Sequence, residues 1–300
     1  MSKKLKKDKI NYEIDIGNCA PCQLNENKKN KKFKTCYSKE SLIKIAKTWN
    51  DQNKDKPQIK IEKKSKEALW KQIQDRLNTV CKKDEYCWKK QDFVKKLRNI
   101  DIEMYTFKPK YPKAWLENKN TWLNTYDIYY VMKQYEKKHN DFVFLGPIPS
   151  DCPTKIQCEL SKFDLITMKK ANINKVGIIY NLDVSSGSGT HWTAMFIDNK
   201  KHEINYYDSY GSLPTKLIGE FIERLVKQYE KNNITPIVIY NDKRHQYGGS
   251  ECGVYSMNFI LERLYGKTMY EISNVEIPDA KMNHLRRLLY NTKVYNSLKK

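Results

Sequence analysis

The sequence has no long apolar run. Its 300 residues contain no stretch of about 18 or more apolar residues, the length that a membrane-spanning helix requires, so we expect no transmembrane segment. The first ten residues, MSKKLKKDKI, are basic but lead into no apolar region, and we therefore expect no secretory signal. Both absences predict an intracellular protein. In a reducing compartment its 8 cysteines are expected to be thiols.

Arginine is scarce, although the chain is strongly basic. Only 7 of its 56 basic residues are Arg, and its formal net charge is +21. Residues 1–150 carry 35 basic and 19 acidic residues, a net +16, whereas residues 151–300 carry 21 and 16, a net +5. The basic half predicts non-specific contact with DNA or another polyanion. An AT-rich genome, which favours Lys codons, explains the same bias without any function. Because Arg is preferred for bidentate phosphate contacts, we do not expect sequence-specific DNA recognition.

The composition is that of a folded protein in three regions. Hydrophobic residues make up 39% and aromatic residues 12% of the chain, too many for a disordered protein. Residues 1–36 are rich in Lys and Asn without periodicity, which indicates a basic flexible arm. Residues 37–110 form a helical basic region and residues 111–300 a third region with mixed elements. The helical patterns of the second region begin at Ser38 and cover 65–80 and 85–97.

Helices and strands alternate in the third region. The strand patterns are short and rich in Val, Ile and Tyr, and the helical patterns have apolar residues at 3.6-residue spacing. This order predicts an α+β fold with an antiparallel hairpin inside a mixed sheet and a buried helix opposite. The expected helices are 125–139, 161–171, 214–232, 252–265 and one after Pro278; the expected strands are 142–145, 175–181, 191–198, 203–208 and 236–241.

Cys252 stands where a thiol becomes nucleophilic. It follows a Gly-Gly-Ser-Glu loop and opens an amphipathic helix, CGVYSMNFILERLYG, that ends at Gly266. The dipole and the first N–H groups of a helix favour a thiolate and offer donors for an oxyanion. A buried structural cysteine that opens a core helix is the alternative interpretation, and for this residue alone it is the better one.

A histidine and an aspartate face each other across the predicted hairpin. With a two-residue turn at 199–200, Asp198 is opposite Lys201. The same register places His191 opposite Asp208, with Cβ atoms roughly 4.5–5.5 Å apart. The carboxylate of Asp208 can then hold one imidazole nitrogen while the other accepts a thiol proton. Taken singly, His191 is explained as a half-exposed strand residue and Asp208 as the start of a turn. Their pairing, with a thiol downstream, favours a catalytic triad.

A glutamine completes this predicted constellation. Gln246 lies six residues before Cys252 and can donate an amide N–H to the developing oxyanion. His245 beside it has no carboxylate at an obvious spacing, although Asp242 leaves its role open. We therefore expect Gln246, and not His245, to take part in the chemistry.

These motifs together resemble one family. The pair HW at 191–192, an Asp at 208 and QYGGSECG at 246–253 are similar to the ubiquitin-like-protein (SUMO-type) protease and adenovirus-protease superfamily. The order His, Asp, Gln, Cys distinguishes this pattern from papain, in which Cys comes first. The resemblance covers roughly 120–270. It implies a papain-like cysteine protease fold, with a mixed central sheet packed on a catalytic helix, and no cofactor.

Two tryptophans resemble the substrate groove of that family. Trp122-Leu123 looks like the segment that begins the family's catalytic domain and lines its groove. Trp192 resembles the tunnel-wall tryptophan that admits only glycine beside the scissile bond. The resemblance thus implies cleavage after Gly-Gly or similar sites, with Trp122 and Trp192 binding the substrate. Ser250 and Glu251 are interpreted as departures in a variable part of the loop.

The basic N-terminal half resembles the extended proteases of large DNA viruses. This similarity rests on the CxxC-containing arm and on the segment TCYSKESLIKIAKTWN at 35–50. It implies processing of viral structural-protein precursors, in the host cytoplasm and in a virion where the basic half keeps the enzyme near DNA. Deconjugation of SUMO or ubiquitin-like modifiers uses the same chemistry and remains an alternative. A catalytically dead nucleic-acid-binding structural protein and an acyltransferase are alternatives of other classes.

Several cysteines of the N-terminal half are candidate zinc ligands. Zinc sites in proteins use clustered Cys and His side chains. The spacing here matches no closed four-ligand pattern and no paired His accompanies it, so we expect no metal site. The candidates are Cys19, Cys22, Cys36, Cys81 and Cys87.

Overall fold

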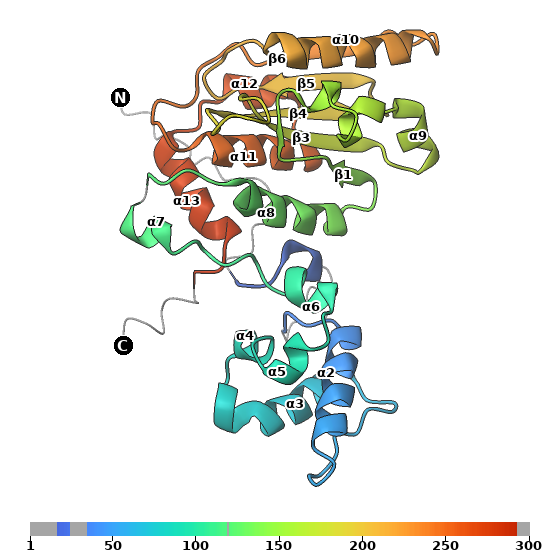
Figure 1. Ribbon diagram of the computed structural model, residues 1–300, viewed down its shortest axis with the longest axis vertical. Helices are drawn as coiled ribbons and strands as arrows, with labels where there is room; N and C mark the ends of the chain where they lie inside the picture. Colours follow the sequence, from blue (N-terminus) through green and yellow to red (C-terminus); the bar gives the residue numbers. More distant parts are fainter. Residues whose placement is uncertain (1–16, 25–34, 119, 293–300) are drawn as a thin grey trace, which may run out of the picture. The chain divides into compact units, whose positions relative to one another are not determined.

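The computed structural model describes most of the chain. The greater part of the predicted basic arm, 1–36, lies outside the described residues. In the described part, no helix is long and apolar enough to cross a membrane. The chain forms two compact units: a sheet unit, whose described residues run from Pro112 to Arg287, and a helical unit of the described residues from Gly17 to Tyr111 together with those from Leu288 (Figure 1). The described residues are 17–24, 35–118 and 120–292.

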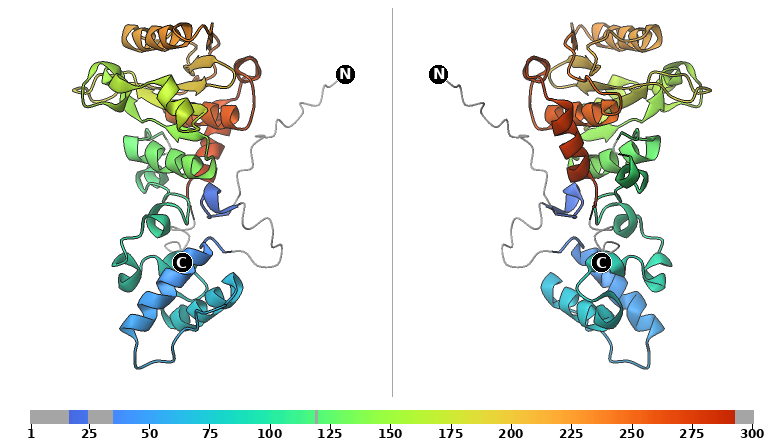
Figure 2. Two further views of the ribbon diagram at one scale, coloured as in Figure 1. Left: turned by 90° about the vertical axis from the view of Figure 1, so that its right-hand side faces the viewer. Right: turned by 90° about the vertical axis from the view of Figure 1, so that its left-hand side faces the viewer.

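The helical unit is built on two long helices, α2 and α3. They start where the sequence predicts because the side chains of Ser38 and Ser65 each accept a hydrogen bond of 3.1 Å from a backbone N–H three residues on. Their apolar sides bury together with Trp49 and Trp88 in one core, and Figure 2 shows the two helices, in blue and cyan, against each other. The elements are η1 (Pro21–Gln23), α2 (Lys39–Gln52), α3 (Lys66–Cys81), α4 (Glu85–Trp88), α5 (Asp92–Lys95) and α6 (Ile100–Met104).

The single helix predicted over 85–97 is wrong, because the chain breaks it into α4 and α5. Gln91, between them, has an extended backbone with φ −68° and ψ 138°. Its side chain turns back and donates to the carbonyl oxygen of Cys87 at 3.2 Å. Such local side-chain bonds offer the backbone an alternative to a continuous helix.

The expectation that all cysteines are thiols is also wrong. Three pairs form disulfides: Cys19–Cys36, Cys81–Cys87 and Cys152–Cys158, with Cα–Cα distances of 4.9, 5.4 and 5.5 Å. The paired cysteines lie 17, 6 and 6 residues apart, and these spacings alone do not reveal that they meet. The thiols of Cys22 and Cys252 remain. Four of the five candidate zinc ligands are thus in disulfides, and no cluster of three or more His, Cys, Asp or Glu able to hold a metal occurs within the described ranges.

A mixed sheet forms the centre of the sheet unit. Its strand order is β1-β3-β4-β5-β6, and β2 also pairs with β3. β4 is antiparallel to both of its neighbours, β3 and β5, whereas β1 and β2 run parallel to β3 and β6 runs parallel to β5. This is the predicted α+β arrangement. The strands are β1 (Phe142–Phe144), β2 (Ile148–Pro149), β3 (Lys175–Asn181), β4 (Trp192–Asp198), β5 (Glu203–Tyr207) and β6 (Ile237–Tyr240).

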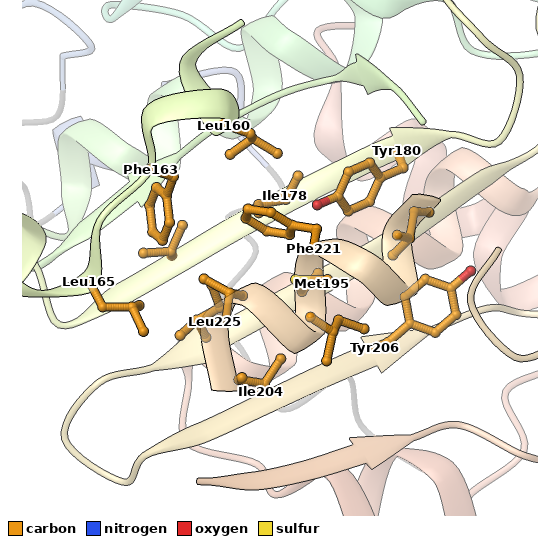
Figure 3. Packing of buried hydrophobic residues seen from close by; sticks show 14 of the residues in the cluster. Leu160, Phe163, Leu165, Ile178, Tyr180, Met195, Ile204, Tyr206, Phe221 and Leu225 are labelled. Atoms are coloured by element: carbon orange, nitrogen blue, oxygen red, sulfur yellow. The ribbon is translucent and has the colours of Figure 1, made fainter. Parts of the chain in front are cut away.

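Two helices cover the two faces of this sheet. Phe221 and Leu225 of α10 pack on Ile178, Met195 and Ile204 (Figure 3). The opposite face of the sheet is covered by α11 (Figure 1). This helix packs closely against β3 because Gly177 has no side chain: a Cβ there would lie 3.1 Å from Ile260 of α11. The remaining elements surround this sandwich. The helices are α7 (Ala114–Glu117), α8 (Thr125–Lys138), η2 (Cys152–Thr154), η3 (Glu159–Lys162), α9 (Leu165–Lys170), α10 (Lys216–Glu230), α11 (Cys252–Leu264), α12 (Met269–Asn274) and α13 (Asp279–Leu289).

The register of the β4–β5 hairpin differs from the prediction. Asp198 pairs with Glu203, not with Lys201, so the connection has four residues instead of two. Its cause is local: the carboxylate of Asp198 accepts the N–H groups of both residues 200 and 201, at 3.0 and 3.1 Å, and His202 has φ +55°. A shift of two residues leaves every side chain on its original face. His191 directly precedes β4 and Asp208 directly follows β5, so neither is directly opposed in the ladder, yet their side chains still meet.

Candidate active site

Cys252 is buried in the first turn of α11. All 13 residues of this helix are buried, and Cys252 is its first residue. Val254 and Tyr255 donate their N–H groups to the carbonyl of Glu251, at 2.9 and 3.0 Å, which closes the first turn. The first N–H groups of a helix have no acceptor inside the helix. They and the helix dipole favour negative charge at this position, whether on a thiolate or on an oxyanion.

His191 and Asp208 are joined by a hydrogen bond. Nε2 of His191 lies 2.8 Å from Oδ1 of Asp208, and both side chains are largely shielded from solvent. The aspartate is itself held in place, because the backbone N–H of Tyr210 donates to the same Oδ1 at 2.8 Å. Asn241 donates its side-chain amide to the Asp208 carbonyl at 2.7 Å. The imidazole thus has a fixed anionic partner on one of its nitrogens.

The same imidazole also interacts with the thiol of Cys252. Burial alone would lower the pKa of His191, but hydrogen bonds to Asp208 and Cys252 and the charges of these two groups outweigh it and raise the pKa to about 9. The ring is further stacked on Tyr210, with centroids 4.6 Å apart. Tyr210 occupies the place opposite His191 that the prediction gave to Asp208. With Nε2 engaged by the carboxylate, Nδ1 is the nitrogen left for the sulfur.

Gln246 is buried beside this group, and its orientation is fixed. Its Oε1 accepts a 2.7 Å hydrogen bond from Oγ of Ser209, so its amide nitrogen faces the other way. That nitrogen donates to the carbonyl of Gly248 at 2.7 Å and, over a longer 3.3 Å, to the hydroxyl of Tyr210. The hydrogen bond from Gln246 to the Tyr210 hydroxyl is the longer and therefore the weaker of the two. A new acceptor, such as an oxyanion, can most easily take over this N–H group.

Trp192 and Leu123 enclose the start of α11. The indole N–H of Trp192 donates to the Leu123 carbonyl at 3.0 Å. Gly253 fits beneath them: a Cβ there would lie 2.8 Å from Leu123 and 3.2 Å from Trp192. Trp122, the other predicted substrate-binding residue, is 46% exposed. The Trp192 ring thus lies beside the start of α11, whereas Trp122 is partly exposed to solvent.

One face of α13 holds the loop before Cys252, which the sequence analysis missed. Asp279, Asn283 and Arg286 are spaced so that they share a helix face. Oδ2 of Asp279 accepts the N–H groups of Tyr247 and Gly248, at 3.0 and 2.7 Å. The helical spacing was readable in the sequence, but its partner loop was not.

Arg286 ties two segments of the site together. Its guanidinium is buried and donates to the carbonyl of Thr121 at 3.1 Å and to that of Ser250 at 2.7 Å. It also lies over the ring of Trp115, 5.0 Å from the centroid. The segment before Trp122 and the loop before Cys252 are therefore fixed to one cation.

Glu251 is an anchored residue, not an incidental one. Its carboxylate accepts from the N–H and the hydroxyl of Ser250, at 3.0 and 2.8 Å, and from Asn283 at 2.9 Å. Burial raises the pKa of Glu251, but these hydrogen bonds and the charge of Arg286 outweigh burial and lower it. The interpretation of Ser250 and Glu251 as departures in a variable part of the loop did not anticipate these contacts.

His245 is a structural histidine. Its Nε2 lies 3.0 Å from the carbonyl of Ser273 and its Nδ1 lies 3.1 Å from the hydroxyl of Tyr207. Burial lowers its pKa, and a neutral ring that donates from Nε2 and accepts at Nδ1 satisfies both contacts. Both nitrogens are occupied, so His245 has none to offer the thiol.

The chain is similar to known proteases. A model of the Ulp1 protease family, C-terminal catalytic domain, matches residues 166–297. A putative thiol protease of Acanthamoeba polyphaga mimivirus is 32% identical over 277 residues, 87% of this chain and 90% of that protein. A SUMO-1 cysteine protease of African swine fever virus (isolate Pig/Kenya/KEN-50/1950) is 31% identical over 124 residues, 40% of this chain and 45% of that protein.

The fold is shared with a solved structure. A crystal structure of a protease of African swine fever virus superposes with a TM-score of 0.64, at 22% identity, over 92% of this chain and 96% of the other. This likeness confirms the predicted α+β protease fold. Together with the similarity along nearly the whole mimivirus protein, it shows that the chain belongs to the Ulp1 protease family and is a cysteine peptidase.

Proposed function

We propose that this peptidase cleaves polypeptides after Gly-Gly-type sites with a triad of Cys252, His191 and Asp208. The observation that carries the proposal is the His191 imidazole, which is hydrogen-bonded to the Asp208 carboxylate at 2.8 Å and whose pKa is raised by its interactions with both Asp208 and the Cys252 thiol. A base that bridges a nucleophile and an orienting acid is the arrangement that nucleophilic catalysis requires.

The chemistry follows from the raised pKa of His191. With that pKa at about 9, the imidazole carries a proton at neutral pH, and we assign this proton to the Cys252 thiol, which leaves a thiolate. The thiolate attacks the scissile carbonyl carbon, and the oxyanion accepts hydrogen bonds from the Cys252 backbone N–H and the Gln246 amide. His191 then protonates the leaving amine. Water, deprotonated by the same imidazole, hydrolyses the thioester and restores the thiol–imidazole pair.

Glycine specificity is supported by the crowding around α11. Trp192 and Leu123 already leave no room for a Cβ on Gly253. A substrate backbone that passes between Trp122 and Trp192 to reach Cys252 is expected to need residues without side chains there. We therefore propose that Trp122 and Trp192 bind the residues next to the scissile bond. The proposed catalytic domain, residues 111–300, contains all of these groups.

For the biological role, we propose the processing of viral structural-protein precursors, in the host cytoplasm and in virions. Its support is the similarity to proteases of two large DNA viruses over much of the chain. The basic residues 37–110 and the arm 1–36 are then proposed to contact DNA or another polyanion without sequence preference. Deconjugation of SUMO-like modifiers is the second candidate, favoured by the name of one viral relative, a SUMO-1 cysteine protease.

A cleavage panel tests these proposals. Wild type and Cys252→Ala would be offered a fluorogenic peptide that ends in Gly-Gly, a precursor fragment with an internal Gly-Gly-X site and a SUMO conjugate, each with and without DNA. We expect the wild type alone to cleave, with the precursor fragment preferred. Preference for the conjugate would favour deconjugation. No hydrolysis of any substrate by the wild type would contradict the catalytic proposal and favour a nucleic-acid-binding protein with an inactive protease fold.

A further inference from the structure

A pocket lies beside Trp192, and none of the three proposed triad residues lines it. Its volume is about 280 Å³, and it lies between the end of β3, the β1–β2 connection and the loop that leads to His191. Trp192 thus contacts the start of α11 near Gly253 and also lines this pocket. The residues used below that line it are Thr125, Pro147, Asn181, Asp183, Ser188 and Trp192.

The loop that lines the pocket is wrapped around the carboxylate of Asp183. Oδ1 accepts the N–H of Val184 at 2.8 Å, and Oδ2 accepts the N–H of Gly189 at 3.0 Å. A Cβ on Gly187 would lie 2.1 Å from Oδ2 of Asp183, and Gly189 has φ +94°. Asn181 joins the two ends of the loop, because its Oδ1 accepts the N–H of Asp183 at 3.1 Å and the N–H of Thr190 at 3.0 Å. The carboxylate is therefore held in one position.

This carboxylate has no cationic partner in the described part of the chain. The nearby Lys155 pairs with Asp151 instead, at 3.4 Å. Each carboxylate oxygen has accepted one hydrogen bond and retains capacity for another. The pocket therefore offers negative charge and free acceptor positions, together with the hydroxyl groups of Thr125 and Ser188, in a protein whose net charge is +21.

The other lining groups suit an aliphatic chain. Trp192 and Pro147 supply apolar and aromatic surface along which the methylene groups of a long side chain can lie. An indole face also attracts a cation. An apolar surface that leads to an unpaired carboxylate is complementary to lysine and arginine, and to few other side chains.

We propose that this pocket binds a lysine or arginine side chain of the polypeptide substrate. The proposal rests on the proposed function and narrows its substrate class to Gly-Gly-type sites with a basic residue nearby. An extended substrate advances about 3.3 Å per residue with side chains on alternating sides. Because Trp192 separates the pocket from Gly253, the basic residue lies a few positions from the scissile bond and is not the glycine itself.

The test uses peptides that contain Gly-Gly and differ at one position. Lys, Arg, Gln and Glu would be placed in turn at the third and fourth residues before the cleavage point and at the second residue after it. Binding to the Cys252→Ala variant would be measured by fluorescence polarisation, so that the result does not depend on turnover. We expect Lys or Arg at one position to bind about 10-fold more tightly than Gln, a difference of about 1.4 kcal/mol, and Glu to bind more weakly than Gln.

Variants in the same background locate the effect. Asp183→Asn removes the charge, and Ser188→Lys places a competing cation in the pocket; each is expected to abolish the difference between Lys and Gln peptides. Ser186→Lys adds the same charge at an exposed residue of the same loop that does not line the pocket, and should leave the difference intact.

Two results would overturn the pocket proposal. One is equal binding of Lys, Arg and Gln peptides at every position. The other is a basic preference that survives both Asp183→Asn and Ser188→Lys. Cleavage of the Gln peptides by the wild-type enzyme reports on the proposed function separately, so a protease without the basic preference and a basic preference without proteolysis are distinct outcomes.

Discussion

The two helices that cover the sheet are similar in length and different in content. α10 has 15 residues and buries a stripe of apolar side chains, Ile218, Phe221, Ile222 and Leu225. α11 has 13 residues and buries all of them, including polar and charged ones. Both helices stabilise the same strands, but only α11 begins with a residue that can react.

The polar residues of α11 show what this burial requires. Buried polar groups must find hydrogen-bond partners. Ser256 donates to the Trp192 carbonyl at 3.1 Å, Glu262 accepts from Lys267 at 2.7 Å, and Arg263 pairs with Glu203. α10 also forms hydrogen bonds, through Gln228 to the backbone of Phe163 and through Tyr229 to Asn199. The comparison teaches that α10 leaves one side to solvent and stabilises the sheet with an apolar stripe, whereas α11 is buried all round, so its polar residues need partners and its first residue is a shielded thiol.

The largest difference between the two helices is expected at the nucleophile. Cys252→Ala removes the attacking sulfur, and His191→Ala removes its base; each should lower kcat/KM for a Gly-Gly peptide by roughly 10⁴-fold. Cys252→Ala removes a single sulfur atom, so its urea unfolding midpoint should change little, whereas His191→Ala also takes the hydrogen-bond partner from the buried Asp208 and should lower the midpoint. Retention of more than a tenth of the activity by Cys252→Ala would contradict the proposed mechanism.

The α10 side should respond in stability and not in chemistry. Phe221→Ala empties a buried site against Phe163 and is expected to lower the free energy of unfolding by about 3–5 kcal/mol. Leu213, which is 70% exposed, gives the control: Leu213→Ala should cost less than about 0.5 kcal/mol. Both are measured by urea unfolding. Active-site titration should show an unchanged kcat per folded Phe221→Ala molecule. A lower kcat would contradict the claim that the α10 side affects stability and not chemistry.

Arg286 tests whether the polar contacts around α11 position the nucleophile. Arg286→Lys keeps the charge but cannot reproduce a planar fork to the two carbonyls, so we expect kcat to fall about 10-fold with little change in KM. Arg287, the next residue, is exposed on the same helix and serves as the matched control: Arg287→Lys should have no effect. Equal kcat values for the two variants would show that Arg286 does not position the loop.

The smallest expected effect is a shift of the pH profile. A pKa of about 9 means that the protonated His191 ring is lost as the pH rises through about 9, so activity should fall along an alkaline limb there. The associated stability is complete below about 6.5, the usual histidine pKa, and disappears over the same rise. Asp208→Asn removes the charge that supports the proton and should move the limb of kcat/KM to lower pH. An unmoved limb would assign it to another group.

Local chemistry was predictable from the sequence, and tertiary contacts were not. Ser38 and Ser65 begin helices because their hydroxyl oxygens accept the backbone N–H of the residue three positions later. Such a cap involves only neighbouring residues, so the sequence alone predicts it. The spacing of His191, Asp208 and Cys252 led to groups that the structure brings into contact, although their catalytic roles stay predictions. The predicted hairpin register is wrong because Asp198 accepts two backbone N–H groups in the turn and the connection is two residues longer than predicted.

The missed features depend on how segments pack together, whether their partners are distant or near in sequence. Arg286 lies 165 residues from Thr121 in sequence and donates to its carbonyl, and no local pattern indicates that pair. Cys152 and Cys158 meet because η2 and η3 fold back on each other. The pocket around Asp183 requires a loop closed by Asn181, and serine and glycine alone suggest only a connection between strands.

The most direct test of the central claim compares the two cysteines that keep their thiols. Iodoacetamide labelling of the native protein between pH 6 and 9, followed by peptide mass mapping, measures the reactivity of Cys252 against that of Cys22. The account predicts that Cys252 labels faster than Cys22 at pH 6, despite its burial, and that His191→Ala removes this excess. Equal labelling of both cysteines at pH 6, or an excess at Cys252 that survives His191→Ala, would contradict it.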